Sequence, residues 1–330
     1  MMTKYSFLSI LFIFSLYGLS QKEYYSDKYL DSIIGEEILI KKNYKNKSLS
    51  EVAQDLKFDG SKELQYAILA KWVVNHLNYD KKSRYISTKS ALNQKKGVCG
   101  HYSIFMDSLA KYLEFNSNYI SGYVKEISND RLLLVPHAWN AVEINKRMMM
   151  SDITWSDRNN VKKSTNATLN RTFFLMEPKK FILTHFPDKK KFRYIKYSYR
   201  KFKTTPVISF GYYTLDKYFV VNIKGIKLYN RQSDLKIILK DRKLTDSIEI
   251  KKIELVKWEK INKDGYKESE YAIELDKKID LKKNEIIYSL SASNLDIEKN
   301  KNVSISIEYK KMNSTGEKKT YFEEVISFFW

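Results

Sequence analysis

One cysteine, one histidine and one aspartate have the residue types that nucleophilic catalysis needs. Cys99 is the only cysteine of the chain, and it lies between Gly97 and Gly100, where an apolar pattern of helical spacing begins. A helix N-terminus supplies positive potential and backbone donors, which lower the pKa of a thiol and favour the nucleophilic thiolate. A cysteine in this place can also be a small buried hydrophobic residue, so its chemistry depends on its neighbours.

His137 and Asp152 are the candidates for those neighbours. His137 opens one strand pattern and Asp152 lies near the end of the next, 15 positions later, so a hairpin loop with an even number of residues places both on one face. A four-residue loop over residues 143–146 sets them directly opposite, with Cβ atoms about 4.5 to 5.5 Å apart. A two-residue loop at Asn145-Lys146 makes them diagonal neighbours.

Either of these loops would place a carboxylate beside the imidazole. The carboxylate would fix the tautomer of His137 and stabilise its imidazolium, which leaves the other ring nitrogen for Cys99. A loop with an odd number of residues would separate the two side chains. His137 would then be an ordinary strand histidine, and Asp152 a turn or capping residue.

The apolar pattern predicts an α+β fold for the part of the chain that carries these residues. Helical spacing runs over residues 63–77 and again from Cys99 onward. Strand-like runs follow at residues 119–124, 138–144 and 147–153. We therefore predict a first domain over residues 21–200.

From about Pro206 onward the predicted elements are strands. The clearest runs are residues 218–223, 235–239, 248–255, 285–290 and 303–309. Asp264-Gly265 and Ser314-Thr315-Gly316 are turn signals between such runs. The clean alternation of the last run indicates a sheet with one face in water. We expect a β-sandwich-like second domain over residues 201–330.

The N-terminus has the pattern of an export signal. Lys4 precedes an uncharged apolar run over residues 7–19, and Gly18-Leu19-Ser20 supplies small residues before the expected cleavage point. The alternative is an uncleaved anchor, for which the run is short. We predict a cleaved signal peptide over residues 1–20 and a secreted or periplasmic protein. The single cysteine excludes an internal disulfide.

The chain is strongly basic, with 59 Lys and Arg against 39 Asp and Glu and a formal net charge of +20. This charge could draw the protein to an anionic envelope surface. The lysines are spread along the whole chain, which indicates a compositional bias. No recognised nucleic-acid motif accompanies the charge, so we expect no nucleic-acid partner.

Several motifs, in order along the chain, resemble the transglutaminase-like superfamily. They are the segments Gly97-Val98-Cys99, His137-Ala138-Trp139-Asn140 and Asp152-Ile153-Thr154-Trp155, preceded by a helix that ends in Tyr79-Asp80. Two later segments, Phe174 to Pro178 and Thr184-His185-Phe186-Pro187, are similar to the kyphoscoliosis-peptidase branch. The resemblance covers roughly residues 60 to 195.

The resemblance implies a papain/transglutaminase-like core in which Cys99 is the nucleophile, His137 the base and acid, and Asp152 the residue that orients the imidazole. Such enzymes act on amides through a thioester, which water resolves in peptidases and an amine resolves in transglutaminases. The chain departs from the family at position 101, where His101 replaces a common glycine. His101 beside the nucleophile would narrow access to it or add a base, so we place it in the substrate cleft.

Other residues would complete the site. The backbone N–H of Cys99 and the side chain of Gln94 are candidate donors to an oxyanion, although a residue such as Gln94 is more often a solvated loop residue. Trp139 and Trp155 flank the triad as core residues and as walls of the substrate cleft.

A zinc site built from Cys99, His101 and His137 is conceivable, because thiolate and imidazole both bind zinc. The family pattern explains two of these residues without metal, so we expect neither a metal nor a cofactor. We expect His185 to be structural.

The first functional hypothesis is therefore an exported transglutaminase-like cysteine enzyme, a peptidase or an acyltransferase, with a protein or peptide substrate. The alternative is a catalytically inactive envelope-binding or scaffold protein that retains the fold. The sequence predicts neither the substrate nor the oligomeric state.

Overall fold

The structure is a computed structural model of the 330-residue chain. It describes residues 27–35, 44–128, 131–157, 169, 171–209, 212–213, 219–224, 235–241, 248–262, 265–274, 276–280, 285–290, 302–312 and 318–329. These residues belong to two compact units. The first comprises residues 1–122, 136–181 and 187–194, and the second comprises residues 123–135, 182–186 and 195–330.

The segment predicted to be a signal peptide, residues 1–20, lies outside the described residues. None of the helices in the described part of the chain has the length and apolar character that crossing a membrane requires. The predicted domain limits at residues 20 and 200 stay predictions.

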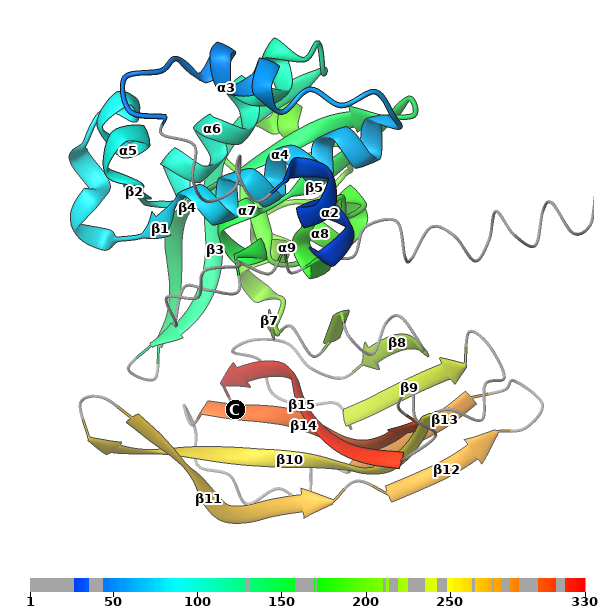
Figure 1. Cartoon of the computed structure of the whole chain (residues 1–330). Helices are drawn as coiled ribbons and strands as arrows, with labels where there is room; N and C mark the ends of the chain where they lie inside the picture. The colour runs from blue at the N-terminus through cyan, green and yellow to red at the C-terminus, as the bar shows by residue number, and fades with distance from the viewer. Residues whose placement is uncertain are drawn as a thin grey trace, which may run out of the picture. The chain divides into compact units, whose positions relative to one another are not determined.

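Two central helices form the core of the first unit (Figure 1). Helix α4, Lys62–His76, is buried on almost all sides, and its N-terminus is capped by the hydroxyl of Ser61, which accepts the Leu64 N–H at 3.2 Å. Helix α6, Cys99–Tyr112, packs against it. Both helices were predicted from the apolar spacing, and the structure confirms them.

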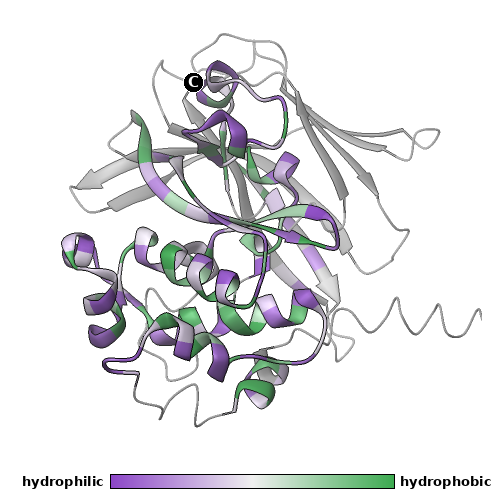
Figure 2. Ribbon diagram, turned by 90° about the horizontal axis from the view of Figure 1, so that it is seen from above, coloured by the Kyte–Doolittle hydropathy of each residue, from purple (hydrophilic) through white to green (hydrophobic). Residues whose placement is uncertain are grey.

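The first unit also contains shorter helices. They are α2 (Asp27–Ile34), α3 (Leu49–Asp55), α5 (Thr88–Gln94), α7 (Ile153–Ser156) and α8 (Pro178–Phe181), and the second unit contains α9 (Tyr199–Thr204). Helices α3, α5 and α7 contact α6. Figure 2 shows hydrophobic and hydrophilic residues side by side on the helices, the pattern of helices that pack on one side and meet solvent on the other.

The chain that leads into Cys99 is held by a short parallel pair of strands. In this pair β1, Asn78–Tyr79, lies beside β2, Lys96–Gly97, with Tyr79 opposite Gly97. The ring of His76, at the end of α4, donates from Nε2 to the carbonyl of Leu92 in α5 at 2.8 Å. Burial lowers the pKa of His76 to about 4, so the ring is neutral and the bond ties α4 to α5.

An antiparallel sheet carries the other candidate residues. Its strand order is β5 (Arg147–Ser151), β4 (Arg131–Ile144), β3 (Ser117–Ser128) and β6 (His185–Pro187). With the helices of the first unit it makes the α+β core that the apolar pattern predicted.

The β4–β5 hairpin settles which of the two predicted loops the chain uses. Ile144 pairs with Arg147, so Asn145 and Lys146 alone form the turn, and both have positive φ, 50° and 61°. Positive φ at both positions is typical of the type I′ turn, whose twist suits antiparallel strands. The two-residue alternative is therefore confirmed, and the four-residue loop is wrong.

The C-terminal part of the chain forms strands in two sheets, as shown in Figure 1. One has the order β11, β10, β14, β15, β7, and the other has the order β12, β13, β9, β8. The bounds are β7 Val207–Ile208, β8 Phe219–Lys224, β9 Leu235–Asp241, β10 Ile248–Asn262, β11 Gly265–Glu274, β12 Asp276–Asp280, β13 Glu285–Leu290, β14 Asn302–Met312 and β15 Lys318–Phe329.

The five predicted C-terminal strands are confirmed as β8, β9, β10, β13 and β14. Strands β7, β11, β12 and β15 were missed. β11 and β12 lie at the edges of their sheets, where polar residues are tolerated and an apolar signal is weak, and β7, also at an edge, has only two residues. Of the turn signals, Gly265 opens β11 opposite Asn262, whereas Ser314 to Gly316 lie outside the described residues. Packing of the two sheets as a sandwich stays a prediction.

A buried lysine anchors the segment that follows α9. Lys125 of β3 is only 5% exposed, and its Nζ donates to the carbonyls of Phe202, Thr205 and Pro206 at 3.3, 2.9 and 2.8 Å. The ammonium also lies 4.7 Å from the centre of the Phe202 ring. Burial lowers the pKa of Lys125 to about 7. This contact fixes the chain just before β7.

The hairpin turn gives the first testable prediction. Replacing Lys146 by glycine should raise the free energy of unfolding by about 0.5 to 1 kcal/mol, because a side chain in the left-handed region is strained and glycine is not. Asn145→Gly is the matched control, and its gain should be smaller because asparagine tolerates this region. Urea unfolding of both variants measures the difference. A loss of stability in Lys146→Gly would contradict the turn geometry.

Candidate active site

Cys99 is the first residue of α6, where the helix presents unsatisfied backbone donors. Val98 is the N-cap residue in extended conformation, and its N–H donates to Nδ1 of His101 at 3.1 Å. The N–H groups of Cys99 and Gly100 lie in the first helical turn and therefore have no intrahelical acceptor. The thiol thus lies in the positive potential of the helix N-terminus, as the sequence predicted.

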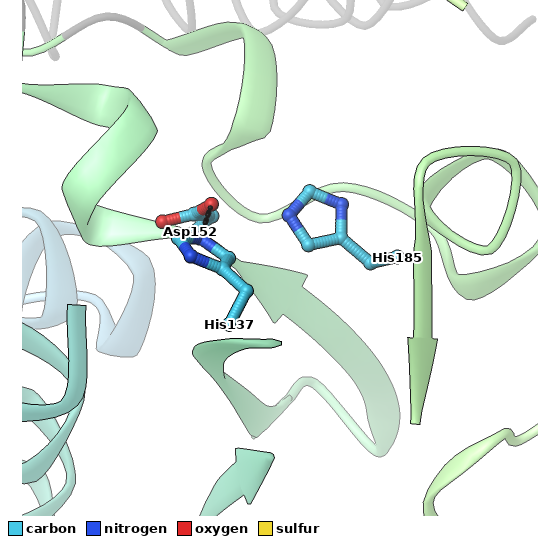
Figure 3. A group of neighbouring side chains, drawn as sticks. All are labelled: His137, Asp152 and His185. Atoms are coloured by element: carbon cyan, nitrogen blue, oxygen red, sulfur yellow. Dashed lines mark hydrogen bonds and ion pairs between the residues drawn. The ribbon is translucent and has the colours of Figure 1, made fainter. Parts of the chain in front are cut away.

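His137 and Asp152 meet across the β4–β5 hairpin, as Figure 3 shows. Nε2 of His137 lies 2.7 Å from Oδ2 of Asp152, and the other carboxylate oxygen accepts the N–H of Trp155 at 3.0 Å. Asp152 is fully buried. The hydrogen bond to Nε2 leaves Nδ1 of His137 for Cys99.

The position of Asp152 differs in one respect from the prediction. The apolar pattern extended the strand to residue 153, but β5 ends at Ser151, and Asp152 is the N-cap residue of the short helix α7. Aspartate is a favoured N-cap because its side chain satisfies a backbone N–H of the first turn. Asp152 therefore caps a helix and binds the histidine at once, two roles that the sequence analysis treated as alternatives.

The charges of Cys99 and His137 stabilise each other. Burial alone would raise the pKa of Cys99, but a hydrogen bond from His137 and its positive charge lower the pKa overall, aided by a backbone hydrogen bond from Ala138. Burial alone would lower the pKa of His137, but the charges and hydrogen bonds of Asp152 and Cys99 raise it well above its ordinary value. The geometry thus favours a thiolate beside an imidazolium, the reactive form of a cysteine nucleophile.

Two tryptophans pack around the imidazole. The ring of Trp155 lies 5.6 Å from that of His137 and is tilted by 36°, and Trp139 lies 6.4 Å away and is nearly parallel. Trp139 is fully buried and Trp155 is partly exposed. They restrict the rotation of His137, while their contact with a substrate stays a prediction.

Comparison with known proteins agrees with this geometry. A sequence model of the transglutaminase-like superfamily matches residues 50–157, the segment that holds Cys99, His137 and Asp152. The chain contains a transglutaminase-like domain. The human and mouse kyphoscoliosis peptidases are each 25% identical to it over 161 residues, which is 45% of this chain. The matched region spans only 24% of the length of these curated relatives.

A crystal structure of a proposed cysteine protease from Cytophaga hutchinsonii is also similar. It is 19% identical, and the likeness covers 36% of this chain and 40% of that one, with a TM-score of 0.28.

His101 and Gln94 lie in different surroundings within the transglutaminase-like domain. His101 is buried, and because its Nδ1 accepts from Val98, the proton is on Nε2, which donates to the Ile86 carbonyl at 3.0 Å. Both ring nitrogens thus bind backbone. Gln94 is exposed at the end of α5. Their roles in the substrate cleft and the oxyanion site stay predictions.

One group among the described residues has the composition of a metal site. The ligand atoms of His137, Asp152 and His185 lie within 4.8 Å of one another (Figure 3). Two imidazoles and a carboxylate suit Zn²⁺ or Fe²⁺. However, both oxygens of Asp152 already accept hydrogen bonds, from His137 and from the Trp155 backbone, so the triad accounts for this pair. His185 is buried and bonds through Nδ1 to the hydroxyl of Thr184 at 2.8 Å.

Tyr119 of β3, which was not predicted, also lies beside the first turn of α6. Its hydroxyl lies 4.0 Å from the position that a Cβ on Gly100 would take, and the charge of Cys99 raises its pKa after the larger effect of burial. Tyr119 stands in an ordinary strand pattern, and nothing in that pattern distinguishes it from the other tyrosines of the chain.

A pair of glycine substitutions tests the entry into α6. A Cβ on Gly97 would lie 2.7 Å from Cβ of His101, so Gly97→Ala should lower the free energy of unfolding by about 1 to 3 kcal/mol. Gly100→Ala is the matched control, since its Cβ would meet only the Tyr119 hydroxyl, at an ordinary contact distance of 4.0 Å, and alanine favours a helix. Thermal unfolding should show a lower midpoint temperature only for Gly97→Ala. Equal behaviour of the two variants would contradict the tight approach of β2 to His101.

The pH dependence of alkylation tests the ion pair. The thiolate and imidazolium coexist above the lowered pKa of Cys99 and below the raised pKa of His137, so iodoacetamide should react well below pH 8.5. At pH 6 the wild type should react on the order of tenfold faster than His137→Ala, in which the thiol lacks the imidazole that opposes the effect of burial on its pKa. The alkylation rate of Asp152→Asn should lie between the rates of the wild type and His137→Ala. Because Cys99 is the only thiol, mass spectrometry of the whole chain follows it directly.

If the alkylation rate of the wild type instead rises with pH around the ordinary cysteine pKa, and His137→Ala gives the same pH profile, the imidazole does not act on the sulfur.

Proposed function

We propose that the protein is an exported cysteine enzyme that acts on peptide amide bonds through a thioester on Cys99. The hydrogen-bonded chain of Cys99, His137 and Asp152 at the N-terminus of α6 carries this proposal. The two relatives named as peptidases support the same chemistry, although this chain spans about a quarter of their length. Its substrate would be a protein or peptide.

The residues perform the reaction in two stages. The sulfur of Cys99 attacks the carbonyl carbon, a carbon–sulfur bond forms, and the carbonyl electron pair moves to oxygen. When that pair returns, the carbon–nitrogen bond breaks and His137 gives its proton to the leaving amine. Asp152 keeps the imidazole oriented and stabilises its positive charge. Water or a second amine, deprotonated by His137, then resolves the thioester, which gives hydrolysis or acyl transfer.

Export and the C-terminal region complete the proposal. The N-terminal segment, Lys4 followed by the apolar run of residues 7–19, supports secretion or a periplasmic location. The net charge of +20 supports an association with an anionic envelope surface. The two C-terminal sheets, in a sandwich-like domain from residue 201, would hold the protein or its substrate there.

A second function rests on the burial of the triad. The side chain of His137 is only 8% exposed, which suits a protein that retained the fold and lost turnover, acting as an envelope scaffold. Such a protein would keep the hydrogen bond between His137 and Asp152 but would form no thioester.

Trapping of the acyl-enzyme decides between the two. The full mature chain is mixed with a peptide library, the reaction is quenched in acid, and the mass of the intact protein is measured by mass spectrometry. We expect a thioester adduct on Cys99 that hydroxylamine releases. Adding a fluorescent primary amine separates the outcomes, since labelled peptide reports acyl transfer and shortened peptide reports hydrolysis.

The control variants are Cys99→Ala, which should give no adduct, and Asp152→Asn, which should lower kcat by about 10² to 10⁴. If the wild type alkylates rapidly yet forms no adduct with any peptide, and Cys99→Ser leaves the cellular phenotype unchanged, the scaffold function replaces the enzymatic one.

A further inference from the structure

The phenol of Tyr119 lies beside the first turn of α6. Tyr119 is the third residue of β3, and its hydroxyl lies 4.0 Å from the Cβ position of Gly100, the residue that follows Cys99. Tyr119 is 37% exposed. The charge of Cys99 acts on the pKa of Tyr119, so this hydroxyl also lies within electrostatic reach of the sulfur.

The hydroxyl keeps its proton at neutral pH and is available as a donor. Burial raises the pKa of Tyr119, and the negative charges of Cys99 and then Asp188 raise it further. Asp188 is held near β3 by the hydroxyl of Ser121, which donates to its carboxylate at 3.2 Å. A neutral O–H next to a thiolate can donate a hydrogen bond without neutralising the nucleophile.

The reaction creates a need for such a donor. When the sulfur of Cys99 bonds to the carbonyl carbon, the oxygen gains a full negative charge, and donors placed in advance stabilise it. The helix offers the N–H groups of Cys99 and Gly100, which have no intrahelical acceptor. A second, side-chain donor is usual for such sites, and the sequence offered Gln94, which lies at the end of α5.

We propose that Tyr119 is the side-chain donor to the oxyanion: its phenolic O–H binds the substrate oxygen together with the N–H of Cys99. This inference rests on the proposed thioester chemistry and adds a catalytic residue to it. A tyrosine hydroxyl serves as an oxyanion donor in other enzymes, so the chemistry has a physical precedent. Charge develops on the oxygen only in the transition state, and the contribution of Tyr119 is therefore to kcat rather than to substrate affinity.

Two reagents of different geometry test this role. Iodoacetamide alkylates Cys99 by displacement at a saturated carbon and forms no oxyanion. A peptide aldehyde adds to the same sulfur, and its carbonyl oxygen occupies the oxyanion position in the hemithioacetal. Tyr119→Phe keeps the ring and removes only the hydroxyl, and Tyr112→Phe, exposed at the far end of α6, is the matched control.

The expected result is a split between the reagents. In Tyr119→Phe the alkylation rate should stay within twofold of wild type, while the affinity for N-acetyl dipeptide aldehydes should fall about tenfold or more, and kcat on a trapped peptide substrate should fall about 10²-fold with little change in KM. Tyr112→Phe should match the wild type with both reagents. A parallel Gln94→Ala variant shows whether the glutamine contributes instead.

The other outcomes overturn the inference in distinguishable ways. If Tyr119→Phe binds the aldehyde as tightly as the wild type and Gln94→Ala binds it more weakly, Gln94 is the donor and the proposed enzymatic function still holds. Normal alkylation with no aldehyde binding in the wild type denies that an oxyanion site exists at all. A wild-type thiol with ordinary reactivity would instead remove the proposed function itself.

Discussion

The carboxylate of Asp152 is fully buried and accepts hydrogen bonds on both oxygens, one from the imidazole of His137 and one from the Trp155 backbone. A buried negative charge is costly unless it is compensated, and an imidazolium beside it is the strongest compensation within reach. The positive charge on His137 in turn stabilises a thiolate at Cys99. The charges of His137 and Cys99 therefore both depend on the buried carboxylate of Asp152.

Two independent elements bring the members of the triad together. The parallel contact of β1 with β2 and the bond from His76 to Leu92 fix where α6 begins, and so fix the sulfur. The two-residue turn at Asn145-Lys146 fixes the register of β4 and β5, and so fixes the imidazole and carboxylate. Since a shift of one residue in a strand turns every side chain to the other face, lengthening or shortening this turn by one residue would separate the imidazole from the carboxylate.

Much of this site could be predicted from the sequence because it depends on local patterns. The helix after Cys99 follows from apolar spacing, and the two permitted loop lengths follow from the parity of the separation between His137 and Asp152. The choice between the two loops could not be made, since both are even and Lys146 is not a residue that favours positive φ. Tyr119 could not be found because its role depends on where β3 lies relative to α6. The polar edge strands β11 and β12 were missed for a similar reason, since pairing with a neighbour, not their own pattern, makes them strands.

Lys125 makes the region around residue 200 an unusual place to divide the protein. The three carbonyls that receive its ammonium belong to residues 202, 205 and 206, after the predicted end of the catalytic domain. A fragment that stops at residue 200 would keep the lysine and lose the three carbonyls that accept its hydrogen bonds, together with the Phe202 ring, and with them the contacts of this part of β3. Strand β3 thus depends on contacts with the chain beyond residue 200, so recombination that exchanges the C-terminal region has to keep residues 202–206 together with β3.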